Sequence, residues 1–250
     1  MELIVLGANG TWPEEGGALS GYLLRQDGFN LWVDCGSGTM ANLQKYIGIG
    51  DVDAMIITHE HADHCVDVYP LFYARYYAHQ GEDHMPLFIP KGFGGRLNGL
   101  LSDESVAAFR EGFDVREVEP GERFQVGPFR VSARGMSHLG LPALGFRFEN
   151  DGRSLSYTGD TGPTPELVEL ARGSDVLLAE ATYQDGDELS SFHLSSRQAA
   201  EHARDAGVGR LVLTHILPTH DRGESIRQAA AVYDGPIDAA VEGFTLEVGE

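Results

Sequence analysis

Cysteine is scarce in this sequence of 250 residues, which contains only Cys35 and Cys65. Two cysteines are too few for the disulfide framework that stabilises many small secreted domains. Long apolar runs are also missing, since none approaches the roughly 20 residues that a membrane-spanning helix needs. The first residues, MELIVLGANG, have no basic region and no cleavage-like site, and they predict a first strand rather than a secretion signal. We therefore expect a cytoplasmic protein with no membrane partner.

Basic residues are few: the 18 Lys and Arg face 38 Asp and Glu, for a net charge of -20. Such a charge repels nucleic acids and anionic membranes at long range, so a large RNA is not expected as a partner. A polyanionic substrate would need local positive charge, which bound metal ions can supply. The alternative is that the negative surface mainly keeps the protein soluble.

Strand and helix patterns alternate along the chain without a low-complexity linker. The strand segments are rich in Val, Ile, Leu and aromatic residues, and Gly and Asp punctuate them. This alternation, with its many hairpins, predicts a single α/β sandwich domain over residues 1–250. We predict strands at 2–6, 20–26, 29–34, 53–58, 86–90, 114–118, 122–134, 143–149, 153–158, 175–180, 210–214, 237–241 and 244–248, and helices at 39–47, 63–79, 95–111, 164–172, 195–206 and 221–233.

A faint internal repeat suggests two similar halves. SGYLLRQDGFNLWVDCGSGT at 20–39 resembles LGFRFENDGRSLSYTGDTGP at 144–163, and LVLTH at 211–215 echoes MIITH at 55–59. Two such halves facing each other would bring their strand-end acids and histidines together. Ordinary hairpin chemistry is the alternative explanation.

The segment THEHADH at 58–64 concentrates metal-binding side chains at the end of an apolar strand. Imidazoles and carboxylates are the usual nitrogen and oxygen ligands of zinc and neighbouring metals. His59 and His61 are two apart in an extended stretch, so both point the same way and Glu60 points away. Asp63 and His64 fall in the first turn of the next helix, and this divergence suits two metal ions better than one. The alternative is a polar loop with solvated histidines.

Further ligands are available at the ends of three other strands. These are His138 in GMSHLG, Asp160 in YTGDTG and His215 in LTHILPTH. Taken singly, each has an ordinary explanation as a surface histidine or a turn aspartate. Together with THEHADH they make a ligand set large enough for two ions.

In the order and strand-end placement of these residues, nearly the whole chain resembles the metallo-β-lactamase fold. The resemblance implies an αββα sandwich of two mixed β-sheets flanked by helices. LWVDCGSGT resembles the first motif of that superfamily, in which Asp34 would brace the metal site. The resemblance assigns one ion to His59, His61 and His138 and the other to Asp63, His64 and His215, with Asp160 as a bridge between them.

A two-metal centre can activate water near neutral pH and clamp the attacking and leaving oxygens. We expect two divalent ions, most simply Zn²⁺, and the same ligands also accept Mn²⁺ or Fe²⁺. True lactamases of this fold generally lack a bridging aspartate, so Asp160 argues against β-lactam hydrolysis. The centre by itself suits phosphodiesters, thioesters and lactones alike.

Glu180 and His193 narrow the choice of chemistry. Glu180 ends the strand in LLAEATY, and His193 precedes a helix that starts with FHLSSRQ. Glu180 could fix one tautomer of His193, which could then protonate a leaving alkoxide; a solvated loop histidine is the alternative. The pair is similar to the glutamate–histidine pair of the tRNase Z branch. The candidate catalytic residues are Asp63, Glu180 and His193.

Two departures from tRNase Z point to a smaller substrate. The segment between His138 and Asp160 has room for one hairpin but not for a tRNA-gripping arm, and ILPTHD stands where those enzymes carry Phe-Ser-x-Arg-Tyr. The closest resemblance is to small, armless relatives, some of which hydrolyse cAMP or cGMP. We therefore expect a phosphodiesterase for small phosphodiesters. The alternatives are a tRNase Z-type endoribonuclease and a thioester or lactone hydrolase of the glyoxalase II type.

An aromatic stripe follows the metal motif at helical spacing in VYPLFYARYYAHQ. Such a stripe can stack a base, although core packing or a subunit interface is a more common role. In tRNase Z-like proteins this helix often helps to form a dimer, so a homodimer is expected. The stripe consists of Tyr69, Phe72, Tyr73, Tyr76 and Tyr77.

Overall fold

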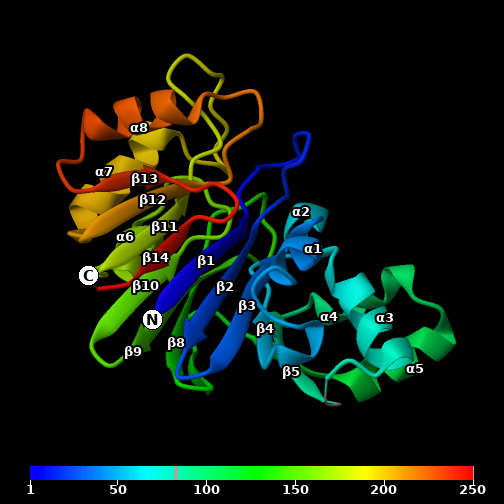
Figure 1. Ribbon diagram of the computed structural model, residues 1–250. Coiled ribbons are helices and arrows are strands. Elements are labelled where there is room, and N and C mark those ends of the chain that lie inside the picture. The colour runs from blue at the N-terminus through cyan, green and yellow to red at the C-terminus, as the bar shows by residue number, and fades with distance from the viewer. Residues whose placement is uncertain (82–83, 250) are drawn as a thin grey trace.

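Two seven-stranded β-sheets pack face to face in the computed structural model, which describes residues 1–81 and 84–249. Helices lie on the outer faces of both sheets, so the layers run helix, sheet, sheet, helix (Figure 1). This arrangement confirms the αββα sandwich of two mixed sheets that the sequence predicts.

Sheet 1 has the strand order β14-β1-β2-β3-β4-β5-β6. Its first four strands pair antiparallel and the remaining pairs are parallel. Leu246 lies opposite Leu3, so segments from both ends of the chain form one edge of this sheet. The strands are β14 (Thr245–Glu247), β1 (Glu2–Gly7), β2 (Gly21–Gln26), β3 (Phe29–Cys35), β4 (Ala54–Ile56), β5 (Met85–Pro90) and β6 (Phe113–Val118).

Sheet 2 has the order β13-β12-β11-β10-β9-β8-β7, with antiparallel pairs from β7 to β10 and parallel pairs from β10 to β13. The carboxyl ends of β8, β10, β11 and β12 therefore meet at one edge of the sheet. The strands are β7 (Arg123–Val126), β8 (Phe129–Gly135), β9 (Leu144–Asn150), β10 (Arg153–Tyr157), β11 (Val176–Glu180), β12 (Arg210–Thr214) and β13 (Ile237–Ala239).

The hairpins β2–β3 and β9–β10 turn through Asp-Gly pairs, Asp27-Gly28 and Asp151-Gly152. All four residues have positive φ. This backbone conformation matches the type I′ turn, which suits the twist of two-residue hairpins. The two hairpins occupy corresponding places in the two strand orders, while the duplication itself stays a prediction.

Alternation along the strands divides the apolar side chains between two layers. In β1, Leu3 and Val5 face sheet 2 in the central core, whereas Ile4 and Leu6 face the helices. Burial on both faces explains why strand segments such as ELIVLG are apolar almost throughout.

The helices start and end at recognisable signals. α7, for example, begins at a capping box formed by Ser195 and Gln198 and ends at Gly207, which has a left-handed backbone. None of the described helices is long and apolar enough to cross a membrane. The α-helices are α1 (Thr39–Leu43), α2 (Ala62–Cys65), α3 (Val68–Ala78), α4 (Gly94–Leu97), α5 (Asp103–Gly112), α6 (Pro165–Ala171), α7 (Ser196–Ala206) and α8 (Arg222–Ala230), with short 3-10 helices at Ile49–Asp51 and Asn98–Leu100.

Several predicted elements are shorter or divided. The helix predicted at 63–79 is split into α2 and α3, because the Asp67 N–H bonds to the Cys35 carbonyl at the end of β3 (2.8 Å). The helix predicted at 95–111 is split before α5, whose first turn Ser102 caps. The strand predicted at 122–134 is a hairpin that turns at Gly127.

Gly127 offers a test of how tightly this hairpin packs. Its φ is 51°, and an added Cβ would lie 2.5 Å from the Phe29 ring, whereas Gly152 has φ 79° and open space around it. We expect Gly152→Ala to cost about 1 kcal/mol of unfolding free energy from backbone strain alone. Gly127→Ala should cost clearly more, because the Phe29 ring must also move. Urea unfolding of both variants would show this, and equal losses would contradict the packing argument.

Candidate metal centre

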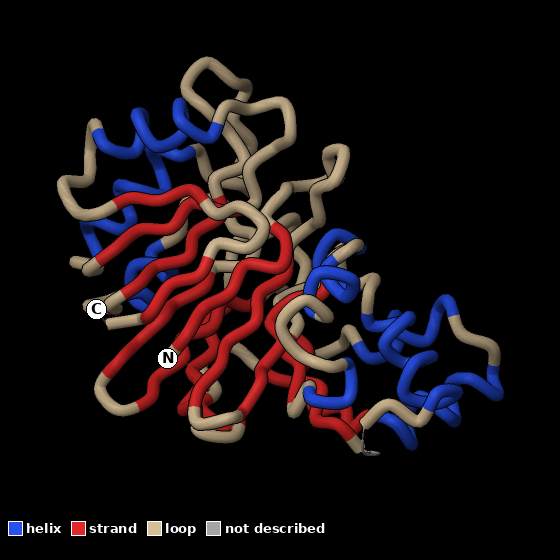
Figure 2. The backbone as a smooth tube through the Cα atoms, in the orientation of Figure 1, coloured by secondary structure: helices blue, strands red, loops and turns tan. Residues whose placement is uncertain are grey.

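Loops gather at one edge of the sandwich, where the strands of sheet 2 end (Figure 2). His59 lies just beyond β4, while His138, Asp160 and His215 follow β8, β10 and β12. His61 caps the start of α2, which carries Asp63 and His64. Thus all seven predicted ligands converge on this edge. Glu60 points elsewhere and pairs with Arg96 at 2.5 Å.

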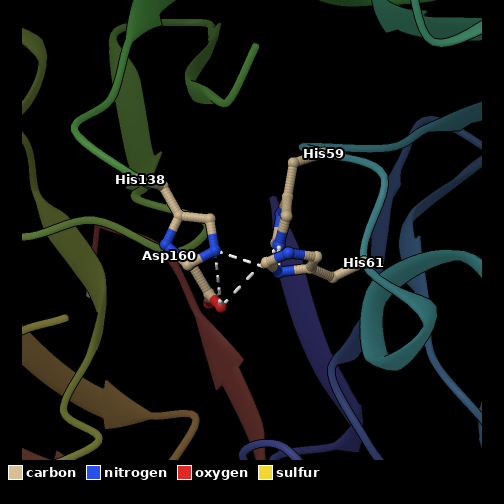
Figure 3. Close-up of side chains that lie close together, drawn as sticks. All are labelled: His59, His61, His138 and Asp160. Atoms are coloured by element: carbon tan, nitrogen blue, oxygen red, sulfur yellow. Dashed lines mark hydrogen bonds and ion pairs between the residues drawn. The ribbon is translucent and has the colours of Figure 1, made fainter. Parts of the chain in front are cut away.

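The converging side chains form two groups that share Asp160. Within each group, the potential ligand atoms all lie within 4.8 Å of one another. Figure 3 shows the first group, with His59 and His61 approaching from one side and His138 and Asp160 from the other. The first group is His59, His61, His138 and Asp160, and the second is Asp63, His64, Asp160 and His215.

In the first group, three ring nitrogens face one another. His61 Nδ1 lies 3.1 Å from His59 Nε2 and 3.0 Å from His138 Nε2. His138 donates through Nδ1 to the Phe192 carbonyl (2.9 Å), so Nε2 of its neutral ring is an acceptor. The Thr58 hydroxyl donates to Asp34 (2.9 Å) and can accept from His59 Nδ1 (3.1 Å), so His59 Nε2 is also an acceptor. Facing lone pairs of this kind fit a cation between them.

The second group contains buried polar atoms without a hydrogen bond among the described residues. These atoms are His64 Nε2 and Asp160 Oδ1, which lie 3.2 Å apart. An unpaired buried carboxylate oxygen is costly unless a cation compensates it. The donor set of both groups therefore fits divalent metal ions, although the ligand roles themselves stay a prediction.

Burial and neighbouring charges shift the pKa values of the candidate ligands in both directions, and neighbouring carboxylates outweigh burial to raise the pKa of His64 well above its ordinary value. Burial lowers the pKa of His59 well below its ordinary value and also lowers the pKa values of His61 and His138. These rings are therefore neutral at physiological pH, as metal binding requires. Burial acts to raise the pKa of Asp160, but His215 and His64 more than offset it and hold this pKa well below the usual value.

Asp34 contacts the candidate ligand His64 and orients its ring. Its buried carboxylate accepts from the Thr58 N–H (2.7 Å), the Thr58 hydroxyl (2.9 Å) and the Tyr157 hydroxyl (2.8 Å), and it contacts His64 Nδ1 at 2.8 Å. A hydrogen bond from His64 Nδ1 leaves Nε2 directed at the centre, which is how carboxylates orient metal-binding histidines. Tyr157 belongs to sheet 2, so this contact also joins the two sheets.

Glu180 and His193 form the pair that the sequence suggests. Glu180 is fully buried, and its Oε1 lies 2.8 Å from Nδ1 of His193, whose side chain is 12% exposed. Burial acts to lower the pKa of His193, but Glu180 and Asp160 outweigh it and raise this pKa to about 9. His193 Nδ1 lies 3.9 Å from Asp160, so the pair stands directly beside the candidate metal ligands.

Thr182 is a residue of the site that the sequence reasoning missed. Its hydroxyl donates to Glu180 (2.8 Å) and accepts from His215 Nδ1 (2.9 Å), which links the Glu180–His193 pair to the second group. The only signal in the sequence is its position two residues after Glu180 in LLAEATY. Threonine is too common near strand ends for that position to stand out.

Comparison with known proteins identifies the family. A family model described as "Beta-lactamase superfamily domain" matches residues 30–216, which is most of the chain. The chain belongs to the beta-lactamase superfamily. An uncharacterized protein of Mycobacterium leprae is 36% identical over 254 residues, which cover 99% of this chain and 89% of that protein.

Two other proteins are similar to the chain over almost their whole length. "Probable metallo-hydrolase YhfI" of Bacillus subtilis is 27% identical over 252 residues, covering 99% of this chain and 100% of that protein. The crystal structure of YhfI, a metallo-beta-lactamase fold protein, superposes with a TM-score of 0.89 at 24% identity and 98% coverage of both chains. "Ribonuclease Z" of Haloferax volcanii is 29% identical over 306 residues, covering 99% of this chain and 95% of that protein. The chain is thus a member of the beta-lactamase superfamily that is similar to a ribonuclease Z. It carries two groups of residues able to hold divalent metal ions.

Two buried tyrosines test the role of Asp34. Tyr157→Phe removes a donor to the carboxylate that orients His64, so we expect about tenfold weaker zinc binding and a loss of about 1 kcal/mol in stability. The matched control is Tyr22→Phe, because the Tyr22 hydroxyl is equally buried but bonds to Thr214 (2.7 Å). That variant should lose stability and keep its zinc affinity.

The measurements are zinc competition against a chromophoric chelator and urea unfolding of the metal-free proteins. Equal zinc affinities in the two variants would show that Tyr157 does not act through Asp34.

Proposed function

We propose that this protein is a two-metal hydrolase of small phosphodiesters, with cyclic nucleotides such as cAMP and cGMP as substrates. The observation that carries the proposal is the Glu180–His193 pair, in which Nδ1 of His193 lies 3.9 Å from Oδ2 of Asp160. Two divalent ions, most simply Zn²⁺, would supply an activated water and neutralise the phosphate charge. His59, His61, His138 and Asp160 would hold one ion, and Asp63, His64, His215 and Asp160 the other.

His193 supplies the proton that a phosphodiester leaving group requires. With Nδ1 engaged by Glu180, Nε2 of the protonated ring is free to donate to the departing 3′-oxygen. An alkoxide leaves poorly without such a proton, whereas a thiolate leaves well without one. The pair therefore favours phosphodiester over thioester hydrolysis. Lactone hydrolysis remains an alternative that a substrate panel distinguishes.

A small substrate fits this chain better than tRNA. Between His138 and Asp160 the chain forms only a short loop and the tight β9–β10 hairpin, in which Arg153 pairs directly with Asn150. The net charge of -20 opposes the approach of a long RNA. The similarity to ribonuclease Z of Haloferax volcanii makes an endoribonuclease the second candidate.

Trp12 offers a surface for the nucleobase. The Thr11 N–H donates to Asp63 (3.2 Å), and a Cβ on Gly10 would lie 2.9 Å from His215 Nδ1, so this loop runs along the second group. Trp12 follows directly, and its side chain is 44% exposed, so its ring is accessible to a ligand. Stacking on a tryptophan recognises a base without demanding a particular one.

A homodimer is also part of the proposal. α3 buries Phe72 against the helices of sheet 1, whereas Tyr73, Tyr76 and Tyr77 remain exposed on the same helix. The outer face of α3 is therefore where a second copy of the chain would pack.

Removal of His193 tests the proposed chemistry. We expect His193→Ala to lower the turnover of cAMP by about 10²- to 10⁴-fold, because the leaving 3′-oxygen loses its proton donor. Hydrolysis of bis-p-nitrophenyl phosphate should fall much less, since p-nitrophenolate leaves without a proton. The bound metal, measured by mass spectrometry, should be unchanged. His202→Ala, a half-buried histidine of α7 outside both candidate ligand groups, is the control and should behave as the wild type.

The same assays should include an S-acyl glutathione and a lactone. Turnover of either ester with inert phosphodiesters would overturn the proposed function. Equal losses of cAMP and bis-p-nitrophenyl phosphate turnover in His193→Ala would refute the proton-donor role alone.

Trp12 can be tested without turnover, because the chain has two tryptophans and the other, Trp32, is fully buried. We expect AMP to quench the fluorescence of the wild type but not that of Trp12→Phe. Trp12→Ala should raise the KM for cAMP about tenfold, and Trp12→Phe less, because it keeps a ring. Quenching that persists in Trp12→Phe would rule out stacking at this residue.

A further inference from the structure

Sheet 2 carries an arginine-lined cavity away from the metal centre. The cavity has a volume of about 690 Å³, and it lies on the outer face of β7, β8 and β9 beside Glu169 and Leu170 of α6. We call it the arginine cavity, after Arg123, Arg130, Arg134 and Arg147, which all line it.

Strand register arranges the four arginines around Ser132. Arg123 of β7 and Arg147 of β9 lie directly opposite Ser132 of β8, and Arg130 and Arg134 lie two residues before and after it. All five side chains share one face, because side chains alternate across a strand. That face is the outer one, since the intervening Val131 and Ala133 are buried in the core between the sheets. The four arginines therefore start within about 7 Å of Ser132.

Three of the four arginines in this cavity have no acidic partner in the described part of the chain. Among residues 1–81 and 84–249, none of Arg123, Arg130 and Arg134 forms an ion pair, although acidic residues outnumber basic ones 38 to 18. The two carboxylates that line the cavity are already engaged: Glu149 pairs with Arg147 (3.2 Å), and Glu169 pairs with Arg172. The cavity is thus a locally positive site on a strongly negative protein.

Protection of a sheet edge does not explain the arrangement. Charged residues on an edge strand deter pairing with other chains, and this accounts for Arg123 on β7. The other three arginines lie on β8 and β9, which are paired on both sides. Like charges on neighbouring strands reduce stability. Glu149 lies opposite Arg130 but pairs with Arg147, so a bound anion would offset the repulsion among the other arginines.

We propose that the arginine cavity binds a small polyanion with two or more phosphate groups, such as an inorganic or nucleoside polyphosphate. Guanidinium groups bind phosphate oxygens in pairs of parallel hydrogen bonds, and Arg123, Arg130 and Arg134 can together engage more than one phosphate. Arg147 is held by Glu149, by the Arg172 carbonyl (2.8 Å) and by the Ser174 hydroxyl (2.8 Å). The Ser132 hydroxyl at the floor provides a further donor. The volume is that of a typical small-molecule site. The proposal is independent of the hydrolase function, because the cavity and the metal centre share no residue.

Calorimetric titration with inorganic tripolyphosphate tests the proposal. We expect the wild type to bind and Arg130→Ala to bind at least about tenfold more weakly. Ser132→Asp should lose binding, because it places a carboxylate among the arginines of the cavity. Arg110→Ala is the matched control, since Arg110 is also exposed and without an ion pair in the described chain but lies on α5. It should bind as the wild type does.

Tripolyphosphate could also chelate metal at the candidate centre. The same titrations in an Asp160→Asn protein, which lacks one candidate ligand, distinguish that chelation from binding in the arginine cavity. Binding that persists there and still depends on Arg130 supports the cavity. Binding that is lost in Asp160→Asn but unchanged in Arg130→Ala overturns the proposal, as does a wild type that binds no tripolyphosphate. Tighter, Arg130-dependent binding of a single-stranded RNA oligonucleotide would also overturn it in favour of a nucleic-acid surface. ADP and ATP, titrated alongside, distinguish a nucleotide from an inorganic ligand.

Discussion

The buried carboxylate of Asp34 is the contact on which both the sandwich and the metal centre depend. It lies at the end of β3 with no exposed surface, and its donors come from the segment after β4, from α2 and from β10 of the opposite sheet. A buried charge is tolerated only when hydrogen bonds satisfy it, and removal of one of several donors costs about 1 kcal/mol. One side chain thereby fixes the spacing of the two sheets and the orientation of His64.

Strained backbone accompanies this arrangement. Asp34 and His215 are both non-glycine residues with a φ of 52°, and both are fully buried at strand ends that border the centre. The left-handed conformation costs an ordinary residue about 1–2 kcal/mol, and it persists where surrounding contacts determine it. From these positions Asp34 contacts Tyr157 of the opposite sheet, and His215 contacts Asp63 of α2. Glu180, the last residue of β11, and Thr182 and His193 in the segment after it border the same centre.

Much of the fold and of the candidate site could be predicted from the sequence, because strand-end polar residues follow a local pattern. THEHADH, His138, Asp160 and His215 each stand at the end of an apolar run, and the structure brings them together as two groups. The division between α2 and α3 could not be predicted, since it depends on a hydrogen bond from Asp67 to the distant Cys35. Thr182 escaped notice because its importance comes from three partners brought together only by folding. The grouping of four arginines around Ser132 could not be predicted, because it depends on the register of β7, β8 and β9.

The pairing of β14 with β1 has a consequence for synthesis on the ribosome. Strand β1 is made first, yet its partner on one side, at Thr245–Glu247, emerges almost 240 residues later. Until then the backbone of Glu2–Ile4 presents an open edge, beside apolar side chains such as Leu3 and Val5. Exposed edges and apolar surface of this kind promote aggregation of nascent chains. Sheet 1 therefore reaches its final form only after translation of the segment that contains β14.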